Sequence, residues 1–183
     1  MRTFGALVNL ALRAVILAIL VEARRHPSDP RYAGKAIGTR GLVMIPMSLL
    51  VPLAHALRRR HGRYPVWTDN LWLSVHALDL AGNHFDLYDR YRHFDAIPHA
   101  HGTGAGTVVV AELLDMPAWS AVGLAQVGHI GLEAQEYYSD VWFGLRNVRG
   151  AWDTINDLLA GAAGSLAYAG ALSLWRRGRA RSR

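Results

Sequence analysis

The C-terminal part of the chain contains an apolar run that strongly limits what it can fold into. From Leu158 to Trp175 there is no charged residue over eighteen positions, and an arginine-rich tail follows, from Arg176 to Arg183. A helix needs about 20 apolar residues to cross a bilayer core of ~30 Å. Basic residues directly after such a run are typical of a membrane boundary. The run therefore predicts a transmembrane helix.

Five other stretches are long and apolar enough to be predicted as further spans. With the C-terminal one, they cover approximately residues 4–22, 37–57, 66–83, 97–115, 118–138 and 154–175. The predicted fold is all-α: a polytopic transmembrane helix bundle of about six helices, forming a single integral membrane domain over residues 1–183. A soluble bundle of buried apolar helices is the alternative. It is less favoured, because tryptophans lie near the predicted span ends, and glycine and alanine recur at close-packing spacing in the last span.

The basic residues lie between and after the apolar stretches, although the formal net charge is +6 and the pI is near 10.2. Without a basic amphipathic helix or a recognisable nucleic-acid motif, this distribution favours membrane lipid and not nucleic acid as the partner. The positive-inside rule places the loop from Arg58 to Arg63 and the C-terminal tail on the cytoplasmic side. We expect a multi-pass protein of the bacterial cytoplasmic (inner) membrane with both termini cytoplasmic. The loop from Arg24 to Lys35 then lies outside, against the rule, unless residues 4–22 lie in the interface or re-enter.

Candidate ligands for a metal ion are confined to Asp, Glu and His, because the chain has no cysteine. Residues 81–102 are dense in Asp, His and Arg, and Asp89 and His93 are four apart, so on a helix they face the same side. The same spacing recurs in His129 with Glu133 and in Asp153 with Asp157. Asp153 also stands where a helix cap would be, so capping alone could explain it.

A further polar stripe lies within residues 66–83, where Asp69, His76 and Asp79 recur at helical spacing. An ionised Asp at the bilayer centre is unfavourable by about 2.5–3.5 kcal/mol on insertion scales, so it should face the bundle interior with a partner. His76 and Asp79, three apart, are predicted to partner each other. This pair could fix helix packing or take part in function.

Two motifs, YDRYRHF (Tyr88–Phe94) and WDTINDLLAGAAG (Trp152–Gly164), with Glu133 between them, resemble the YjdF (DUF2238) family of small bacterial membrane proteins and, more distantly, VanZ-like proteins. The resemblance covers roughly residues 66–170. It implies a multi-span membrane protein with a loose link to the cell envelope, and no particular reaction. The positions that it marks are Asp89, Arg90, His93, Glu133, Asp153 and Asp157. The chain departs from the family pattern around His93, which Arg92 precedes in place of glycine.

Three functions remain open from the sequence. The first is a metal-dependent enzyme acting on a lipid or lipid-linked head group at the outer face, with Asp89, His93, Glu133 and Asp157 as catalytic residues. In that case the same four residues and Asp153 would hold one or two divalent metal ions. The second is a small ion-coupled transporter using His76, Asp79, His129 and Glu133. The third is a non-catalytic accessory or structural protein with a membrane-protein partner; the second and third both allow a homo-oligomer.

Overall fold

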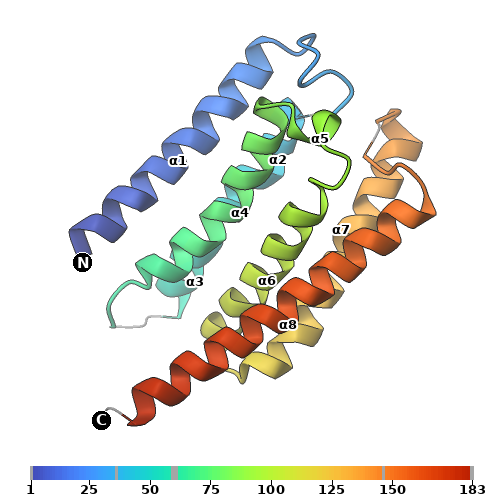
Figure 1. The fold of residues 1–183 in the computed structure, drawn as a ribbon. Helices are drawn as coiled ribbons and strands as arrows, with labels where there is room; N and C mark the ends of the chain where they lie inside the picture. Colours follow the sequence, from blue (N-terminus) through green and yellow to red (C-terminus); the bar gives the residue numbers. More distant parts are fainter. Residues whose placement is uncertain (1, 36, 59–61, 146, 182–183) are drawn as a thin grey trace. The chain divides into compact units, whose positions relative to one another are not determined.

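The computed structural model describes residues 2–35, 37–58, 62–145 and 147–181, and over these residues the chain is helical without any strand (Figure 1). The helices are α1 (Arg2–Arg25), α2 (Ile37–Ser48), α3 (Leu50–Leu57), α4 (Val66–His84), α5 (Leu87–Arg90), α6 (Ala96–Leu113), α7 (Ala118–Phe143) and α8 (Ala151–Arg181). The predicted all-α class is confirmed. Of the arginines used above to orient the chain, Arg59, Arg60 and Arg183 lie outside the described residues.

Every predicted span coincides with a helix or a helix pair, but not every helix qualifies as a span by itself. Among the described residues, α1 over Thr3–Arg25 and α8 over Ala151–Arg181 are long and apolar enough to cross a membrane. The pair of α2 and α3 would add a third if it is one bent span. Two or three candidate spans are thus found, and the six-span arrangement stays a prediction.

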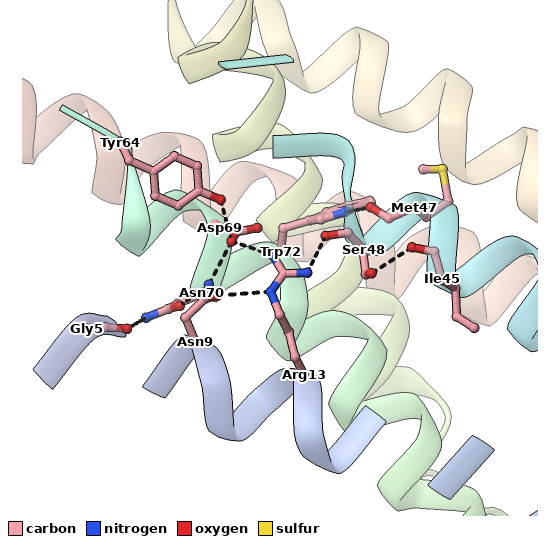
Figure 2. Close-up of polar contacts among 10 residues, drawn as sticks. All are labelled: Gly5, Asn9, Arg13, Ile45, Met47, Ser48, Tyr64, Asp69, Asn70 and Trp72. Carbon is pink, nitrogen blue, oxygen red and sulfur yellow. Dashed lines mark hydrogen bonds and ion pairs between the residues drawn. The ribbon is translucent and has the colours of Figure 1, made fainter. Parts of the chain in front are cut away.

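The segment predicted as one span over residues 37–57 is broken near its middle. The axes of Arg40–Ser48 and Leu50–Leu57 differ by 42°. Pro52 has no N–H to donate to the carbonyl of Ser48 four residues earlier, so the helix ladder fails there. Arg13 of α1 donates to the Ser48 carbonyl at 3.1 Å, and the Trp72 indole of α4 donates to the Met47 carbonyl at 2.6 Å (Figure 2). Neighbouring helices therefore satisfy the carbonyls that the break releases.

The described helices fall into two compact units. The first comprises Met1–Phe94 and Phe143–Arg146, and the second comprises Asp95–Trp142 and Asn147–Arg183. In the first unit α1 and α4 run in parallel, since Gly5 lies against Val66 at one end and Arg31, just beyond α1, bonds His84 at the other. Their shared core contains Ile16, Ile19, Leu20, Leu73 and Leu80.

The second unit depends on an unusually close approach between α6 and α8. The two helices run in parallel, because Ala100 near the start of α6 meets Gly164, and Glu112 near the end of α6 pairs with Arg176, which comes later on α8. A Cβ on Gly164 would overlap the backbone of Ala100, so only glycine fits there. Such small-residue contacts let helix backbones touch in lipid. α7 joins them through a core of Ala111, Ala118, Ala121, Ala169 and Leu172.

We predict that Gly164→Ala destabilises the protein strongly, whereas Gly170→Ala on the same helix does not. The new methyl group at position 164 meets rigid backbone, and overpacking of this kind is unfavourable by about 1–3 kcal/mol or more. Gly170 has open space around its Cβ position, so alanine there should be neutral or slightly stabilising through its better helix propensity. Thermal unfolding followed by circular dichroism in detergent measures both. Equal midpoints for the two variants would contradict the prediction.

Candidate metal centre

Three helices of the second unit bring five ionisable side chains together. Asp95 and His99 belong to the start of α6, His129 and Glu133 to α7, and Asp157 to α8. Glu133 is only 6% exposed, and His129 and Asp157 are similarly buried. Ionisable groups are rarely buried in this way unless they are paired or hold a ligand. The cluster is therefore the strongest candidate for a functional site among the described residues.

Three atoms of this cluster form a compact triangle. His99 Nδ1 and His129 Nε2 are 2.8 Å apart, and each lies 3.4 Å from Glu133 Oε1. His129 and Glu133 share one face of α7 because they are four residues apart. A Zn²⁺ ion about 2.0–2.1 Å from its ligands separates them by roughly 3.0 Å in octahedral and roughly 3.4 Å in tetrahedral geometry. The triangle therefore already has the dimensions of one face of a metal coordination shell.

The charge and hydrogen bonding of the triangle also suit a cation. Glu133 Oε1 is buried and accepts no hydrogen bond from the described residues. An oxygen in this state is unfavourable by ~1–3 kcal/mol or more, and a bound cation would remove that penalty. Two imidazoles with one carboxylate form the ligand set of catalytic zinc sites and of non-haem Fe(II) sites, both of which keep coordination positions open.

The other nitrogen of His99 faces two further carboxylates. Asp95 Oδ1 lies 3.3 Å and Asp157 Oδ1 lies 3.9 Å from His99 Nε2. Asp95, His99 and Asp157 are close enough to form a second group that could hold an ion. One imidazole thus connects the two groups, with a different set of partners at each ring nitrogen.

Small residues of the WDTINDLLAGAAG motif make room for these imidazoles. A Cβ on Gly161 would overlap the ring of His129, so the glycine lets α7 place its histidine against α8. Thr103 Oγ1 donates to the His99 carbonyl at 2.9 Å within α6. The buried hydroxyl of Ser165 accepts a hydrogen bond from Gln126 of α7 at 3.0 Å. The glycine-rich stretch is thus what allows three helices to present ligands to one point.

The predicted site residues divide between the two units. Glu133 and Asp157 lie in the cluster. Asp153 lies one turn before Asp157 on α8, where its carboxylate accepts the Arg149 amide at 2.9 Å, as a capping residue would. In the first unit, Asp89 of α5 forms an ion pair with Lys35, and His93 is exposed in the turn after α5. The convergence of these two residues with Glu133 and Asp157 stays a prediction.

Sequence reasoning left Asp95 and His99 out of the predicted site and assigned His129 to the transport alternative only. The signal that could have found them is the spacing itself. Asp95 with His99 repeats the four-residue interval that was noticed in His129 with Glu133 and in Asp153 with Asp157. Three such pairs stand on three successive long helices.

The first unit holds a second buried polar cluster, but its charges neutralise each other (Figure 2). Asp69 is 0% exposed, and its Oδ2 accepts hydrogen bonds from Arg13 at 2.7 Å, Asn9 at 2.7 Å and Tyr64 at 2.6 Å. Burial, together with the bond to Asp69, raises the pKa of Tyr64, so its hydroxyl remains a donor. Asp69 is thus held by an arginine of α1, which the sequence analysis did not pair with it.

The predicted partnership of His76 and Asp79 is replaced by other contacts. Asp79 accepts the Tyr88 hydroxyl at 2.8 Å and lies 3.6 Å from the guanidinium of Arg40. His76 packs edge-on against the ring of Trp72, and its Nε2 has no hydrogen bond to the described residues. The stripe on α4 therefore serves mainly to hold α1, α2 and α5 against α4.

Comparison with known proteins adds no further assignment: no protein family, curated protein or solved structure matches the chain. The resemblance to the YjdF (DUF2238) family is a prediction that rests on the quoted motifs.

We predict that Arg13→Met destabilises the protein and that adding Asp69→Leu restores part of the loss, because the buried charge is removed while the Ser48 carbonyl and the donors Asn9 and Tyr64 stay without these partners. Removing one member of a buried ion pair typically reduces stability by about 3–5 kcal/mol, because the other charge stays buried, whereas replacing both by apolar residues is often neutral. Arg90→Met is the matched control, since Arg90 pairs with Asp86 at the surface and such pairs contribute about 0–1 kcal/mol. The midpoint of thermal unfolding in detergent measures the stability of Arg13→Met, of the double variant and of Arg90→Met. A double variant as unstable as Arg13→Met would refute this account.

Proposed function

We propose that this chain is a multi-pass membrane protein of the bacterial inner membrane whose second unit holds a divalent metal ion and hydrolyses a bond in a lipid or lipid-linked head group. The observation that carries the proposal is the buried triangle of His99, His129 and Glu133, with its unpartnered carboxylate oxygen. The membrane part is supported by the two helices, α1 and α8, that are long and apolar enough to span a bilayer.

The tryptophans of the second unit support a membrane placement for α7 as well as α8. Trp119 and Trp142 stand near opposite ends of α7, and Trp152 and Trp175 do so on α8; all four are exposed. Each pair is separated by the same number of residues, 119 to 142 and 152 to 175, which is about 35 Å along a helix. The separation of the two tryptophans on each helix therefore matches the thickness of a hydrocarbon core of ~30 Å with one tryptophan in each interface.

His99 and Asp157 place one side of the site toward the end of the unit where α6 and α8 begin. Asp157 comes six residues after Ala151, the first residue of α8, and thus about 9 Å along the helix. His99 stands within the first turn of α6. The aromatic side chains of Tyr138, Trp142 and Trp152 mark the same end of the unit. On α7, His129 and Glu133 come 13 and 9 residues before Trp142, or about 20 and 14 Å along the helix. A metal ion bound by these residues would therefore lie inside the hydrocarbon core, and a head group would have to reach it from this end of the unit.

The chemistry that such an ion supplies is Lewis-acid polarisation of a phosphoester or carboxylic ester together with activation of water. The oxygen of water forms a bond to phosphorus or to the carbonyl carbon. The bond from that atom to the alcohol oxygen breaks, and the alcohol leaves with one of the protons of water. Zinc and similar ions perform this reaction without a cysteine or serine nucleophile.

The second candidate, an accessory membrane protein without catalysis, is favoured by the polar contacts that need no ion. His99 and His129 bond each other at 2.8 Å, and Asp89 is paired with Lys35. In this case the cluster would fix the packing of α6, α7 and α8 for a partner protein. Metal content separates the two candidates.

We expect protein purified in detergent to contain one equivalent of a transition metal ion, or to take it up after reloading, and Glu133→Gln to lose it. Glu112→Gln is the matched control, because Glu112 lies in the same unit but pairs with Arg176 away from the cluster. Elemental analysis of the folded variants gives the stoichiometry. Wild-type protein that stays free of metal after reloading, or Glu133→Gln that keeps it, would rule out the metal centre.

We further expect chelation to abolish hydrolysis of lipid phosphates and lipid diphosphates presented in mixed micelles. Phosphate release is measured for wild type, Glu133→Gln and Glu112→Gln. A metal-loaded wild type without hydrolysis of any such substrate or of phospholipid esters would favour the accessory role.

A further inference from the structure

His99 presents its two ring nitrogens to chemically different surroundings. Nδ1 faces His129 Nε2 at 2.8 Å and Glu133 Oε1 at 3.4 Å. Among the described residues, Nε2 faces two carboxylates, with Asp95 Oδ1 at 3.3 Å and Asp157 Oδ1 at 3.9 Å. A neutral imidazole has one nitrogen with a free lone pair and one that carries a proton. Because carboxylates accept hydrogen bonds, the arrangement favours the tautomer with the proton on Nε2.

The two groups are not equally suited to hold an ion. In the triangle, all three distances lie between 2.8 and 3.4 Å, the range that one metal ion imposes on its ligands. In the group around Nε2, the Asp157 oxygen is 3.9 Å away. Glu133 Oε1 has no hydrogen bond among the described residues, whereas Asp95 Oδ1, 3.3 Å from His99 Nε2, can accept the one proton that this nitrogen offers. The triangle is therefore the better ligand set, and the aspartates are left with the ring proton.

The carboxylate of Asp95 can contact His99 because it does not cap α6. It occupies the N-cap position of α6 but makes no side-chain capping hydrogen bond. Its carboxylate is instead directed along the helix to His99, four residues later. Asp157 reaches the same nitrogen from α8 and is buried. Asp95 thus orients the ring from its own helix, whereas Asp157, at 3.9 Å from the same nitrogen, lies beyond hydrogen-bond distance and acts on it through its charge.

We infer that Asp95 and Asp157 are positioning residues for His99: Asp95 accepts its Nε2–H and the Asp157 carboxylate acts on the same nitrogen by its charge, so that Nδ1 is available as a metal ligand beside His129 and Glu133. This inference rests on the proposed metal centre. It changes the role that the sequence suggested for Asp157, from a ligand to a carboxylate that orients a ligand. Carboxylates in this position fix the tautomer of a ligating histidine and raise its basicity, and their loss weakens metal binding by 10–100-fold.

The test is a titration of metal-free protein with Co²⁺, in which the visible absorption of the bound ion measures binding. We expect Asp157→Asn and Asp95→Asn to bind one equivalent with the wild-type spectrum, because the ligands are unchanged, but with about 10–100-fold lower affinity. We expect Glu133→Gln to lose the site or to change its spectrum, and Glu112→Gln to match wild type. Circular dichroism and size-exclusion chromatography confirm folding, and Asp95→Asn provides the test if Asp157→Asn does not fold.

The outcomes separate this inference from the function on which it rests. If wild type binds no Co²⁺, the metal centre itself is wrong, and the inference falls with it. If wild type binds Co²⁺ and an aspartate variant loses its stoichiometry or shifts its spectrum as Glu133→Gln does, that aspartate is a ligand, and only the positioning role is overturned. Wild-type affinity in both aspartate variants would also overturn it.

Discussion

Buried charge has to be balanced inside an apolar bundle, and this requirement organises both units of the molecule. In the first unit, Asp69 is balanced by Arg13, and the same guanidinium also satisfies the Ser48 carbonyl that a proline releases. One side chain thus joins α1, α2 and α4, and its removal would expose a charge and a broken helix together. In the second unit, Glu133 faces two imidazoles and, among the described residues, no arginine or lysine. One oxygen of each carboxylate, Asp69 Oδ1 and Glu133 Oε1, accepts no hydrogen bond from the described residues, but only Asp69 has a guanidinium to balance its charge.

Close backbone packing is what makes the second cluster possible. Side chains from three helices reach one point only if the helices approach closely, and glycine at positions 161 and 164 of α8 allows this against His129 and Ala100. The glycines therefore serve the site as well as the fold. The same packing excludes water from Glu133, which strengthens its attraction to any cation that enters. Stability and ligand binding are here consequences of the same helix contact.

The helical class and the helix positions follow from apolar run lengths, so the sequence predicts them well: all six predicted spans fall on helices. The break near Leu49 depends on Pro52, a single residue inside an apolar run whose length alone predicts one unbroken span. Glu133 and Asp157 were found because they share a four-residue interval with a neighbour. The contact of His99 with both residues requires that the first turn of α6 faces α7 and α8. A single sequence does not predict how these helices are aligned along their lengths. The Arg13–Asp69 pair is likewise a contact between distant helices, predictable only from the rule that each buried charge needs an opposite one.

The contacts in the first unit bear on the one conflict that the predicted topology contains. An interfacial or re-entrant first segment would have removed the conflict, but α1 follows α4 in parallel from Gly5 to beyond its end, as a full span would. The loop that follows must then carry its positive charge at the same end of the unit as His84. Two of its four basic residues are in ion pairs: Arg31 binds Glu22 and Asp29, and Lys35 binds Asp89. Hydrogen bonds from Arg31 lower the pKa of Asp29 to about 2, so this partner remains ionised at any physiological pH. Two of the four positive charges that would contradict the positive-inside rule in the predicted topology are thus paired locally, one of them by Asp89.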